Sequence, residues 1–501
     1  MRYPLPRPSK PAVIARLSIA AALLCLTGTA RATDYLAATP AAIARVSSAV
    51  KQGDTVVLTN GLWNDAQITF RAEGSVAKPI IVRAETPGKV ILTGKSWLRI
   101  AGNHIIVQDL VFQGCTTDHD LFSFRLDPKE GASTVKKSFS LTLKAHDCEL
   151  SNCVFMDCEP EDPSRESRWV TVYGTGNHVS KCYLSSKNSP GAMLRVFSGG
   201  EVLNHVIEGN HFGRRGRAQG GEAETLRIGD MAAADQTTHV TVDSNLFEEC
   251  GGEDAIVNQS SGNVFRHNTF KACEGRLSLR LGMNCAVEGN YWLGGTSGVF
   301  LSDAGHRVIN NYFADLKAPA AAAPVCLAAS TPAAAGSVLA FNTFVNCGAS
   351  LAFVAAEAGP RDCTIACNIF AQCGSSPFAL ADKLVNPSGA DNIVQPGAAG
   401  QPATEGIQWV DPRLAADKDG IWRPAAGSPA LGTAKSGPTN VTEDIDGQPR
   451  GAAKDIGCHQ LSGATTPHLL LAAEQCGANW MHQAVPGHQT KRTIGREREV
   501  H

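Results

Sequence analysis

The sequence predicts an all-β protein, a right-handed parallel β-helix with a short capping helix near its N-terminus. A short motif recurs at intervals of roughly 20 to 35 residues, which is typical of a solenoid built from stacked rungs. Gly is abundant and aromatic residues make up only 6% of the chain, which suits short strands and tight turns better than long helices. Alternating stretches such as 239–243 (HVTVD) place apolar and polar side chains on opposite faces of a strand.

The recurring motif is Asn or Cys, then any residue, then an aromatic residue or Leu, often with Cys three residues later. It begins at Cys153, Cys182, Asn210, Asn245, Asn268, Asn290, Asn311, Asn342 and Asn368. Equivalent positions of a solenoid stack on one another. We therefore expect an Asn ladder that bonds the neighbouring backbone, an aromatic ladder in the core, and cysteines that act as small buried apolar residues. Disulfides remain an alternative, because stacked rungs bring thiols together.

The remaining segments fit the same fold. Thr39-Pro40 indicates a helix start, and the apolar residues that follow predict a short helix that caps the first rung. Strands are expected over 55–58 and 80–83, and the Ala/Pro-rich segment 316–337 is expected to be a loop. The β-helix domain should span 33–460, with 461–501 as a poorly ordered C-terminal tail.

The first 32 residues have the pattern of a secretory signal peptide. A basic start precedes an apolar run too short for a permanent membrane anchor, and Ala30-Arg31-Ala32 is a small-x-small cleavage site. We therefore expect an exported protein, periplasmic or secreted, with no membrane span. Cleavage would leave 40 basic against 47 acidic residues. Nucleic acid is disfavoured as a partner, and a polyanionic substrate would need a local basic cluster.

Several segments resemble polysaccharide lyase family six, which contains alginate lyases and chondroitinase B. They are 78–94 (KPIIVRAETPGKVILTG), 220–229 (GGEAETLRIG), 242–247 (VDSNLF) and 305–313 (GHRVINNYF). The resemblance covers roughly residues 37–460. It implies β-elimination on a uronic-acid polymer, with calcium or cationic side chains at the carboxylate, a Lys base, and an Arg at the leaving group about twenty residues later.

Carrying these roles onto the chain gives a divided result. Arg280 matches the family's catalytic Arg, whereas Gln259 stands in the place of the Lys base. A neutral amide cannot accept the proton, so the usual mechanism cannot run unchanged. Lys271, His267 or His306 could replace the base; otherwise they are surface residues.

The resemblance also implies a calcium site and a basic substrate groove. The regions that match the calcium ligands contain Gln219, Glu222, Glu253 and Asp254, which could equally be turn residues and solvated charges. The residues expected to bind an anionic polysaccharide are Arg227, Arg266, Arg276, His306 and Arg307.

Three functions fit these observations. The first is a lyase that cleaves a uronic-acid polymer, with alginate as the expected substrate. The second is a non-catalytic polysaccharide-binding relative that has lost the Lys. The third is a glycoside hydrolase, which needs two carboxylates at the scissile bond. Its candidates are Glu222, Glu224, Asp230, Glu253 and Asp254.

Overall fold

The structure is a computed structural model of the chain. It describes residues 32–126, 144–199, 202–216, 223–317, 324–328, 335–348, 350–354, 360–373, 378–379, 384–397, 405–462 and 470–482. The described residues from Thr33 onward form one compact unit. The predicted signal peptide lies, except for its last residue, outside the described residues. No helix among those described is long and apolar enough to cross a membrane.

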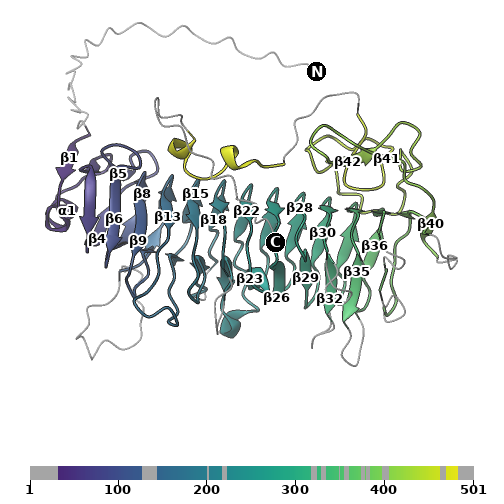
Figure 1. Ribbon diagram of the computed structural model, residues 1–501, viewed down its shortest axis with the longest axis horizontal. Coiled ribbons are helices and arrows are strands. Elements are labelled where there is room, and N and C mark those ends of the chain that lie inside the picture. Colours follow the sequence, from purple (N-terminus) through teal and green to yellow (C-terminus); the bar gives the residue numbers. More distant parts are fainter. Residues whose placement is uncertain are drawn as a thin grey trace, which may run out of the picture. The chain divides into compact units, whose positions relative to one another are not determined.

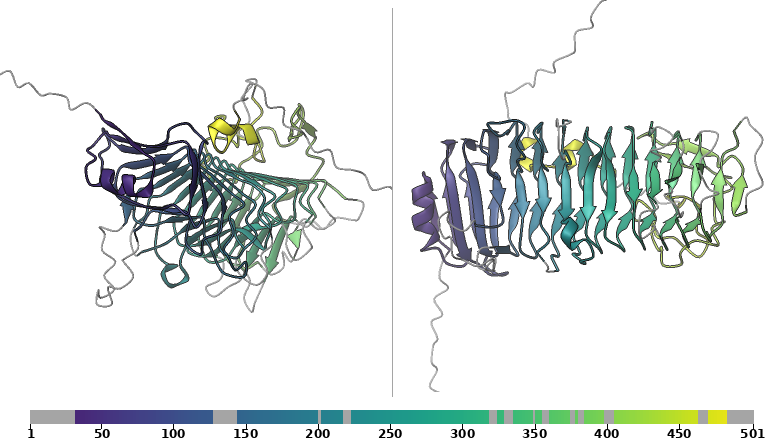
Figure 2. Two further views of the ribbon diagram at one scale, coloured as in Figure 1. Left: turned by 60° about the vertical axis from the view of Figure 1, so that its left-hand side comes forward. Right: turned by 90° about the horizontal axis from the view of Figure 1, so that it is seen from below.

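Three parallel sheets run along this unit, and over most of its length each rung contributes one strand to each sheet in the order A, B, C (Figures 1 and 2). Sheet A contains β1 (Asp34–Ala37), β2 (Thr55–Leu58), β5 (Ile80–Ala84), β8 (Ile105–Gln108), β12 (Glu149–Ser151), β15 (His178–Ser180), β18 (Val206–Glu208), β21 (Thr241–Asp243), β24 (Val264–Arg266), β27 (Ala286–Glu288), β30 (Arg307–Ile309), β33 (Val338–Ala340) and β36 (Thr364–Ala366). The predicted strands at 55–58 and 80–83 are confirmed as β2 and β5.

Sheets B and C complete each rung. Sheet B contains β3 (Gly61–Asn64), β6 (Val90–Gly94), β9 (Val111–Cys115), β13 (Val154–Met156), β16 (Tyr183–Ser185), β19 (His211–Phe212), β22 (Leu246–Glu248), β25 (Thr269–Lys271), β28 (Tyr291–Leu293), β31 (Tyr312–Ala314), β34 (Thr343–Val345), β37 (Ile369–Ala371), β39 (Asn392–Val394) and β40 (Ile407–Trp409). Sheet C contains β4 (Gln67–Glu73), β7 (Trp97–Asn103), β10 (Phe122–Ser123), β11 (Ala145–His146), β14 (Val170–Val172), β17 (Leu194–Val196), β20 (Leu226–Gly229), β23 (Asp254–Gln259), β26 (Arg276–Leu281), β29 (Val299–Leu301), β32 (Val325–Ala328), β35 (Leu351–Val354) and β38 (Phe378–Ala379). The fold is the predicted parallel β-helix.

The predicted capping helix is α1 (Pro40–Ser47). The Thr39 side chain accepts a hydrogen bond from the backbone N–H of Ala42, and Pro40 occupies the start of the helix. Ile43 is buried against the first rungs. The helix thus covers the end of the solenoid, where unpaired strand edges would otherwise be exposed.

Both predicted ladders are present. Each Asn side-chain oxygen accepts the backbone N–H of the preceding Asn, from Asn210 through Asn245 and Asn268 to Asn392, at 2.9–3.1 Å. The aromatic rings stack at centroid distances of 4.6–4.9 Å in the order Phe212, Phe247, Phe270, Trp292, Phe313, Phe344 and Phe370. The motif is therefore structural. Its Asn residues form hydrogen bonds with buried backbone amides, and its aromatic residues fill the core.

The cysteines of the described residues form no disulfide bond with one another, and all but Cys373 are buried. Cys153 and Cys182 lie on successive rungs, and burial raises the pKa of the Cys153 thiol well above its usual value. The interpretation of these residues as small buried side chains is confirmed for this structure. Their thiols are poor nucleophiles in the folded state.

The segment 316–337 differs from the expected loop. In the middle of this Ala/Pro-rich segment, Val325–Ala328 forms strand β32 of sheet C. Its four residues are all apolar, so the strand can turn apolar side chains toward the core. After β40, a hairpin of β41 (Leu414–Ala416) and β42 (Trp422–Pro424) begins a turn-rich region. Its apolar side chains Val441, Ile445 and Ile456 form a buried cluster with outer side chains of sheets A and B.

The tail was expected to be poorly ordered from residue 461, but residues 470–482 lie along the outer side of sheet B (Figure 1, yellow). Two short 3₁₀ helices, η4 (Ala473–Gln475) and η5 (Asn479–Met481), form this segment, which we call the C-terminal strap. Its backbone bonds Thr269 and Gly209, and Trp480 donates to the carbonyl of Asn152 at 2.9 Å. The strap therefore crosses several rungs.

Candidate active site

Sheet C carries arginines on strands β17, β20 and β26, and two of these arginines occupy stacked positions. Arg195 of β17 is in register with Arg227 of β20, and both point outward because their neighbours along the strand are buried apolar residues. Arg276 and Arg280 lie on β26, two rungs further along. Parallel pairing thus brings together cations that are up to 85 residues apart in the sequence.

Each of these arginines contacts a carboxylate. Arg280 Nη2 lies 2.6 Å from Asp254 Oδ2 and 3.0 Å from Glu253 Oε1. Arg276 contacts the same two carboxylates at 2.9 and 2.6 Å. Asp254 is buried, whereas the Glu253 side chain is 72% exposed. Arg276, Arg280, Glu253 and Asp254 thus form one ion-pair cluster, which we call the Arg280 cluster. Within it, Glu253 faces solvent.

Next to this cluster, Arg227 connects Glu224 to Gln259. Its Nη1 donates to Glu224 Oε1 at 2.9 Å and its Nη2 donates to Gln259 Oε1 at 3.2 Å. Burial, together with the nearby Arg195, lowers the pKa of Arg227 to about 10. Burial raises the pKa of Glu224, whose side chain is almost inaccessible. Gln259 is also buried.

An aromatic pair extends the site toward the N-terminal rungs. The rings of Tyr173 and Phe197 stack with centroids 4.5 Å apart. The Arg125 guanidinium lies 4.1 Å from the Tyr173 ring, and that of Arg195 lies 4.9 Å from the Phe197 ring. Arg195 also pairs with Asp230. Sheet C therefore presents a surface of arginines and aromatic rings beside the Arg280 cluster.

The structure separates the predicted site residues into two groups. Arg227, Gln259, Arg276, Arg280, Glu253 and Asp254 come together on sheet C. Lys271 lies on sheet B and pairs with Glu248 at 2.8 Å, and His267 lies in the turn between sheets A and B beside Asp243. Neither belongs to the Arg280 cluster. His267 directly precedes Asn268 of the ladder and Lys271 follows it, so both lie in the part of the rung that passes from sheet A to sheet B.

The other basic residues expected at the substrate are also elsewhere. Arg266 and Arg307 lie on sheet A and pair with Asp243 and Glu288. His306 is completely buried, with its Nε2 bonded to the Ser302 carbonyl at 2.7 Å. Arg266, Arg307 and His306 therefore do not share a groove with Arg280, because residues close in sequence lie on different sides of a triangular rung.

Sequence reasoning missed Arg195 and the aromatic pair. The signal was present: Leu194-Arg195-Val196 repeats as Leu226-Arg227-Ile228, which would have placed both arginines in one outward row. Tyr173 and Phe197 each directly follow a strand of sheet C, at equivalent positions of neighbouring rungs.

Calcium usually takes six to eight oxygen ligands. Gln219 and Glu222 lie outside the described residues. Glu253 and Asp254 are each paired with two arginines, and the described residues contain no group of three or more His, Cys, Asp or Glu placed to hold a metal ion. The two described members of this predicted donor set, Glu253 and Asp254, are thus held in ion pairs with arginines.

Comparison with known families identifies the chain. The family model described as Chondroitinase B matches residues 39–369. The chain belongs to this family. It is the polysaccharide lyase family six that the sequence motifs indicated, and the parallel β-helix is the fold of its members. A comparison with curated proteins finds no significant relative.

Solved structures of family-six lyases resemble the chain throughout its β-helix. The family-six alginate lyase AlyGC is 25% identical, with a TM-score of 0.70 over 87% of this chain and 59% of AlyGC. The chain thus spans less than two thirds of AlyGC. A mannuronic acid specific family-six lyase from human gut microbiota is 26% identical, with a TM-score of 0.64 over 76% of this chain and 91% of that one. A family-six alginate lyase in complex with a trisaccharide is 18% identical, with a TM-score of 0.62 over 80% and 92%, and shows the fold alone.

Proposed function

We propose that this family-six protein is an exported polysaccharide lyase that cleaves a uronic-acid polymer by β-elimination, with alginate as its substrate. The observation that carries the proposal is the Arg280 cluster on sheet C. The side chain of Arg280 is 40% exposed, so that it can contact a polymer lying across the strands. Family-six relatives described as alginate lyases and as a mannuronic acid specific lyase support the choice of substrate.

β-Elimination requires a base, and Gln259 cannot serve. We assign this role to Glu253, because it is a solvent-exposed carboxylate 3.0 Å from Arg280. Asp254 and Glu224 are buried and ion-paired, which keeps them from reaching a sugar carbon.

The proposed step uses the substrate, Glu253, Arg280 and one water molecule, and afterwards Glu253 gives its proton to the hydroxide that the water leaves. Glu253 takes the proton from the carbon beside the uronate carboxylate, and that electron pair forms the carbon–carbon double bond. The glycosidic carbon–oxygen bond breaks, and the leaving oxygen takes a proton from water. Arg280 stabilises the negative charge that develops during this step.

The test is ultraviolet absorbance of the purified mature protein with alginate, dermatan sulfate and polygalacturonate, first with calcium and then with a chelator. We expect absorbance to rise with alginate, because elimination creates an unsaturated product. Arg280→Ala and Glu253→Gln should each reduce the rate at least about 100-fold. Full activity of Arg280→Ala would remove Arg280 from the mechanism, and full activity of Glu253→Gln would remove Glu253 as the base.

A second function is favoured by one specific observation. The position that matches the family's base is the buried amide Gln259, and among the described residues its side chain bonds to Arg227 alone. A polysaccharide-binding protein without catalysis would need no base. Folded protein that binds alginate but gives neither ultraviolet-absorbing product nor new reducing ends would establish this second function. New reducing ends without absorbance would instead indicate hydrolysis.

A further inference from the structure

A cavity of about 250 Å³ lies away from sheet C, where the turn-rich C-terminal region meets sheet A. Strands β24, β27 and β30 supply one wall through Arg266, Glu288 and Arg307, and the loop 440–444 supplies the other. The loop is anchored, because Asn310 donates to the Glu443 carbonyl at 2.7 Å and accepts from Arg450 at 2.9 Å. The cavity is therefore formed by two fixed elements.

Two guanidinium groups line this cavity in the same way. Arg266 donates through Nε to Asp243 Oδ2 at 2.6 Å, and Arg307 donates through Nε to Glu288 Oε1 at 3.2 Å. Within the part of the chain that the structure describes, neither residue uses its Nη1 or Nη2 in a further protein contact. Both arginines are thus oriented by a carboxylate while their terminal donor pairs remain available.

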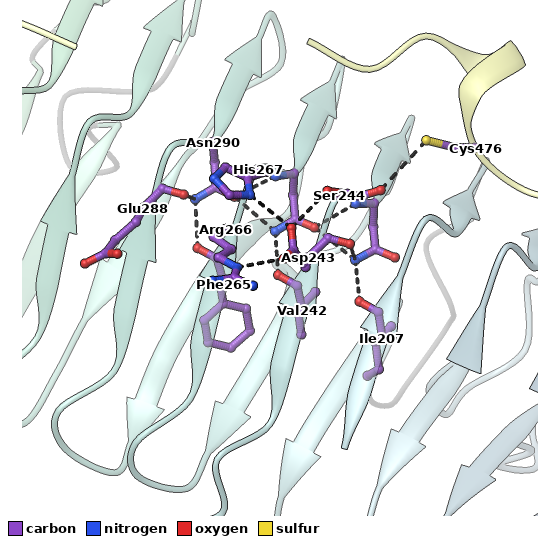
Figure 3. Close-up of polar contacts among 12 residues, drawn as sticks. Ile207, Val242, Asp243, Ser244, Phe265, Arg266, His267, Glu288, Asn290 and Cys476 are labelled. Atoms are coloured by element: carbon purple, nitrogen blue, oxygen red, sulfur yellow. Dashed lines mark hydrogen bonds and ion pairs between the residues drawn. The ribbon is translucent and has the colours of Figure 1, made fainter. Parts of the chain in front are cut away.

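His267 adds a third nitrogen group. Its Nδ1 lies 3.1 Å from Asp243 Oδ1, and Figure 3 shows Arg266, His267 and Ser244 converging on the Asp243 carboxylate. Because Nδ1 is held by Asp243, Nε2 is the ring atom left for a ligand. The side chains of Arg266, His267 and Arg307 are each between 37 and 48% exposed, so the cavity opens to solvent.

The chemistry of this lining selects a class of ligand. Planar donor pairs of two arginines match a carboxylate, which accepts hydrogen bonds from both of its oxygens. The carboxylates of Glu288 and Glu443 supply acceptors for hydroxyl groups. The volume lies below the usual range for drug-sized ligands, which limits the occupant to about one sugar ring.

We infer that this cavity is a second, non-catalytic binding site for a single uronate unit of an anionic polysaccharide. The choice of a uronate rests on the proposed function, whereas the site itself does not. Bound here, a polymer would be held by a face of the solenoid other than the catalytic sheet C. The site would therefore raise the affinity for long polymers without changing the cleavage of short ones.

The test is calorimetric titration of the full chain with a mannuronate trisaccharide. The starting protein carries Arg280→Ala so that the probe is not consumed. The titration should show two binding events. Adding Arg266→Gln and Arg307→Gln should raise the dissociation constant of one of them at least tenfold and leave the other unchanged. The matched control is Arg45→Gln, on the exposed side of α1. Thermal unfolding shows whether each variant is folded.

Other probes separate the sources of binding. Inorganic phosphate tests for a general anion site, and maltotriose tests for a sugar site without a carboxylate. Binding of phosphate but not of the trisaccharide, equal binding of maltotriose, or a titration that the double substitution leaves unchanged would each overturn the inference.

Activity gives an independent readout. With Arg280 intact, the double variant should cleave the trisaccharide at a rate within about twofold of the unsubstituted protein, but migrate faster through a gel containing alginate. If the protein cleaves no polymer, the proposed lyase function fails while the titration still tests the second site.

Discussion

Arg227 donates two hydrogen bonds to one atom of Gln259, its side-chain oxygen, from Nη2 at 3.2 Å and from Nε at 3.4 Å. The position that the sequence motif matches to the family's Lys base thus lies against a fixed guanidinium group. A lysine here would have its charged form disfavoured by the like charge and by burial. Both effects lower its pKa and make a neutral amine available as a base.

The first prediction follows from this contact. Gln259→Lys should raise the rate of alginate cleavage at least about tenfold, because a positioned base typically contributes 10²–10⁴-fold. The rate should increase with pH as the introduced amine loses its proton, measured by ultraviolet absorbance across a pH series. The control is Gln259→Met, which has similar length and no amine. Equal rates in the two variants would contradict the prediction.

The second prediction concerns the Asn ladder. The Asn290 side chain accepts from the backbone N–H of Asn268 and donates to the carbonyl of Phe265, both at 2.9 Å, in a buried position. Asn290→Ala leaves these buried groups unpaired, so the free energy of unfolding should fall by roughly 2–4 kcal/mol. Urea unfolding measures this change. The exposed Asn60→Ala should cost much less, and a similar loss in both variants would refute the role of burial.

The sequence predicts those structural features of the protein that recur from rung to rung, and it does not predict those that occur once. The Asn and Phe ladders were predictable because stacked positions must satisfy the same environment in every rung. Arg280 and Gln259 could be placed by their motif. Lys271 and His267 could not, because a one- or two-residue step around a turn moves a side chain from one sheet to another. The strap was missed because its contacts, such as Trp480 with Asn152, occur once and leave no periodic pattern.

The third prediction concerns pH and Asp243. Burial alone would raise the pKa of Asp243, but bonds from His267, Arg266 and Ser244 outweigh it and lower the pKa to about 2. This lowered pKa contributes stability that is complete above the ordinary carboxyl pKa of 3.8 and is lost as the pH falls through about 2. Asp243→Asn should therefore reduce the free energy of unfolding by roughly 2 kcal/mol at pH 7. The difference from the unsubstituted protein should narrow between pH 4 and pH 2 in chemical unfolding. A constant difference over that range would exclude this linkage.

The fourth prediction concerns the strap. Trp480 packs so closely on Gly88 that a Cβ there would come 2.6 Å from the ring. Trp480→Ala removes this packing and the bond to Asn152, so residues 470–482 should exchange amide hydrogens faster. The free energy that opens the strap should fall by roughly 1–2 kcal/mol. Met481→Ala is the control, because Met481 is 41% exposed. Cleavage of short substrates should be unchanged, since the strap lies on sheet B. Unaltered exchange in Trp480→Ala would show that the tryptophan does not hold the strap.

The strap also has a consequence for biosynthesis. Neighbouring rungs are close in sequence, so they can assemble one after another as the chain lengthens, whereas the bond from Asn479 to Asn152 joins residues 327 positions apart. Until residues 470–482 exist, the apolar side chains of Val111 and Val154 on sheet B have no cover from Ala478 and Trp480. The newly made solenoid therefore passes through an interval in which these apolar side chains are exposed to solvent, and the synthesis of residues 470–482 ends that interval.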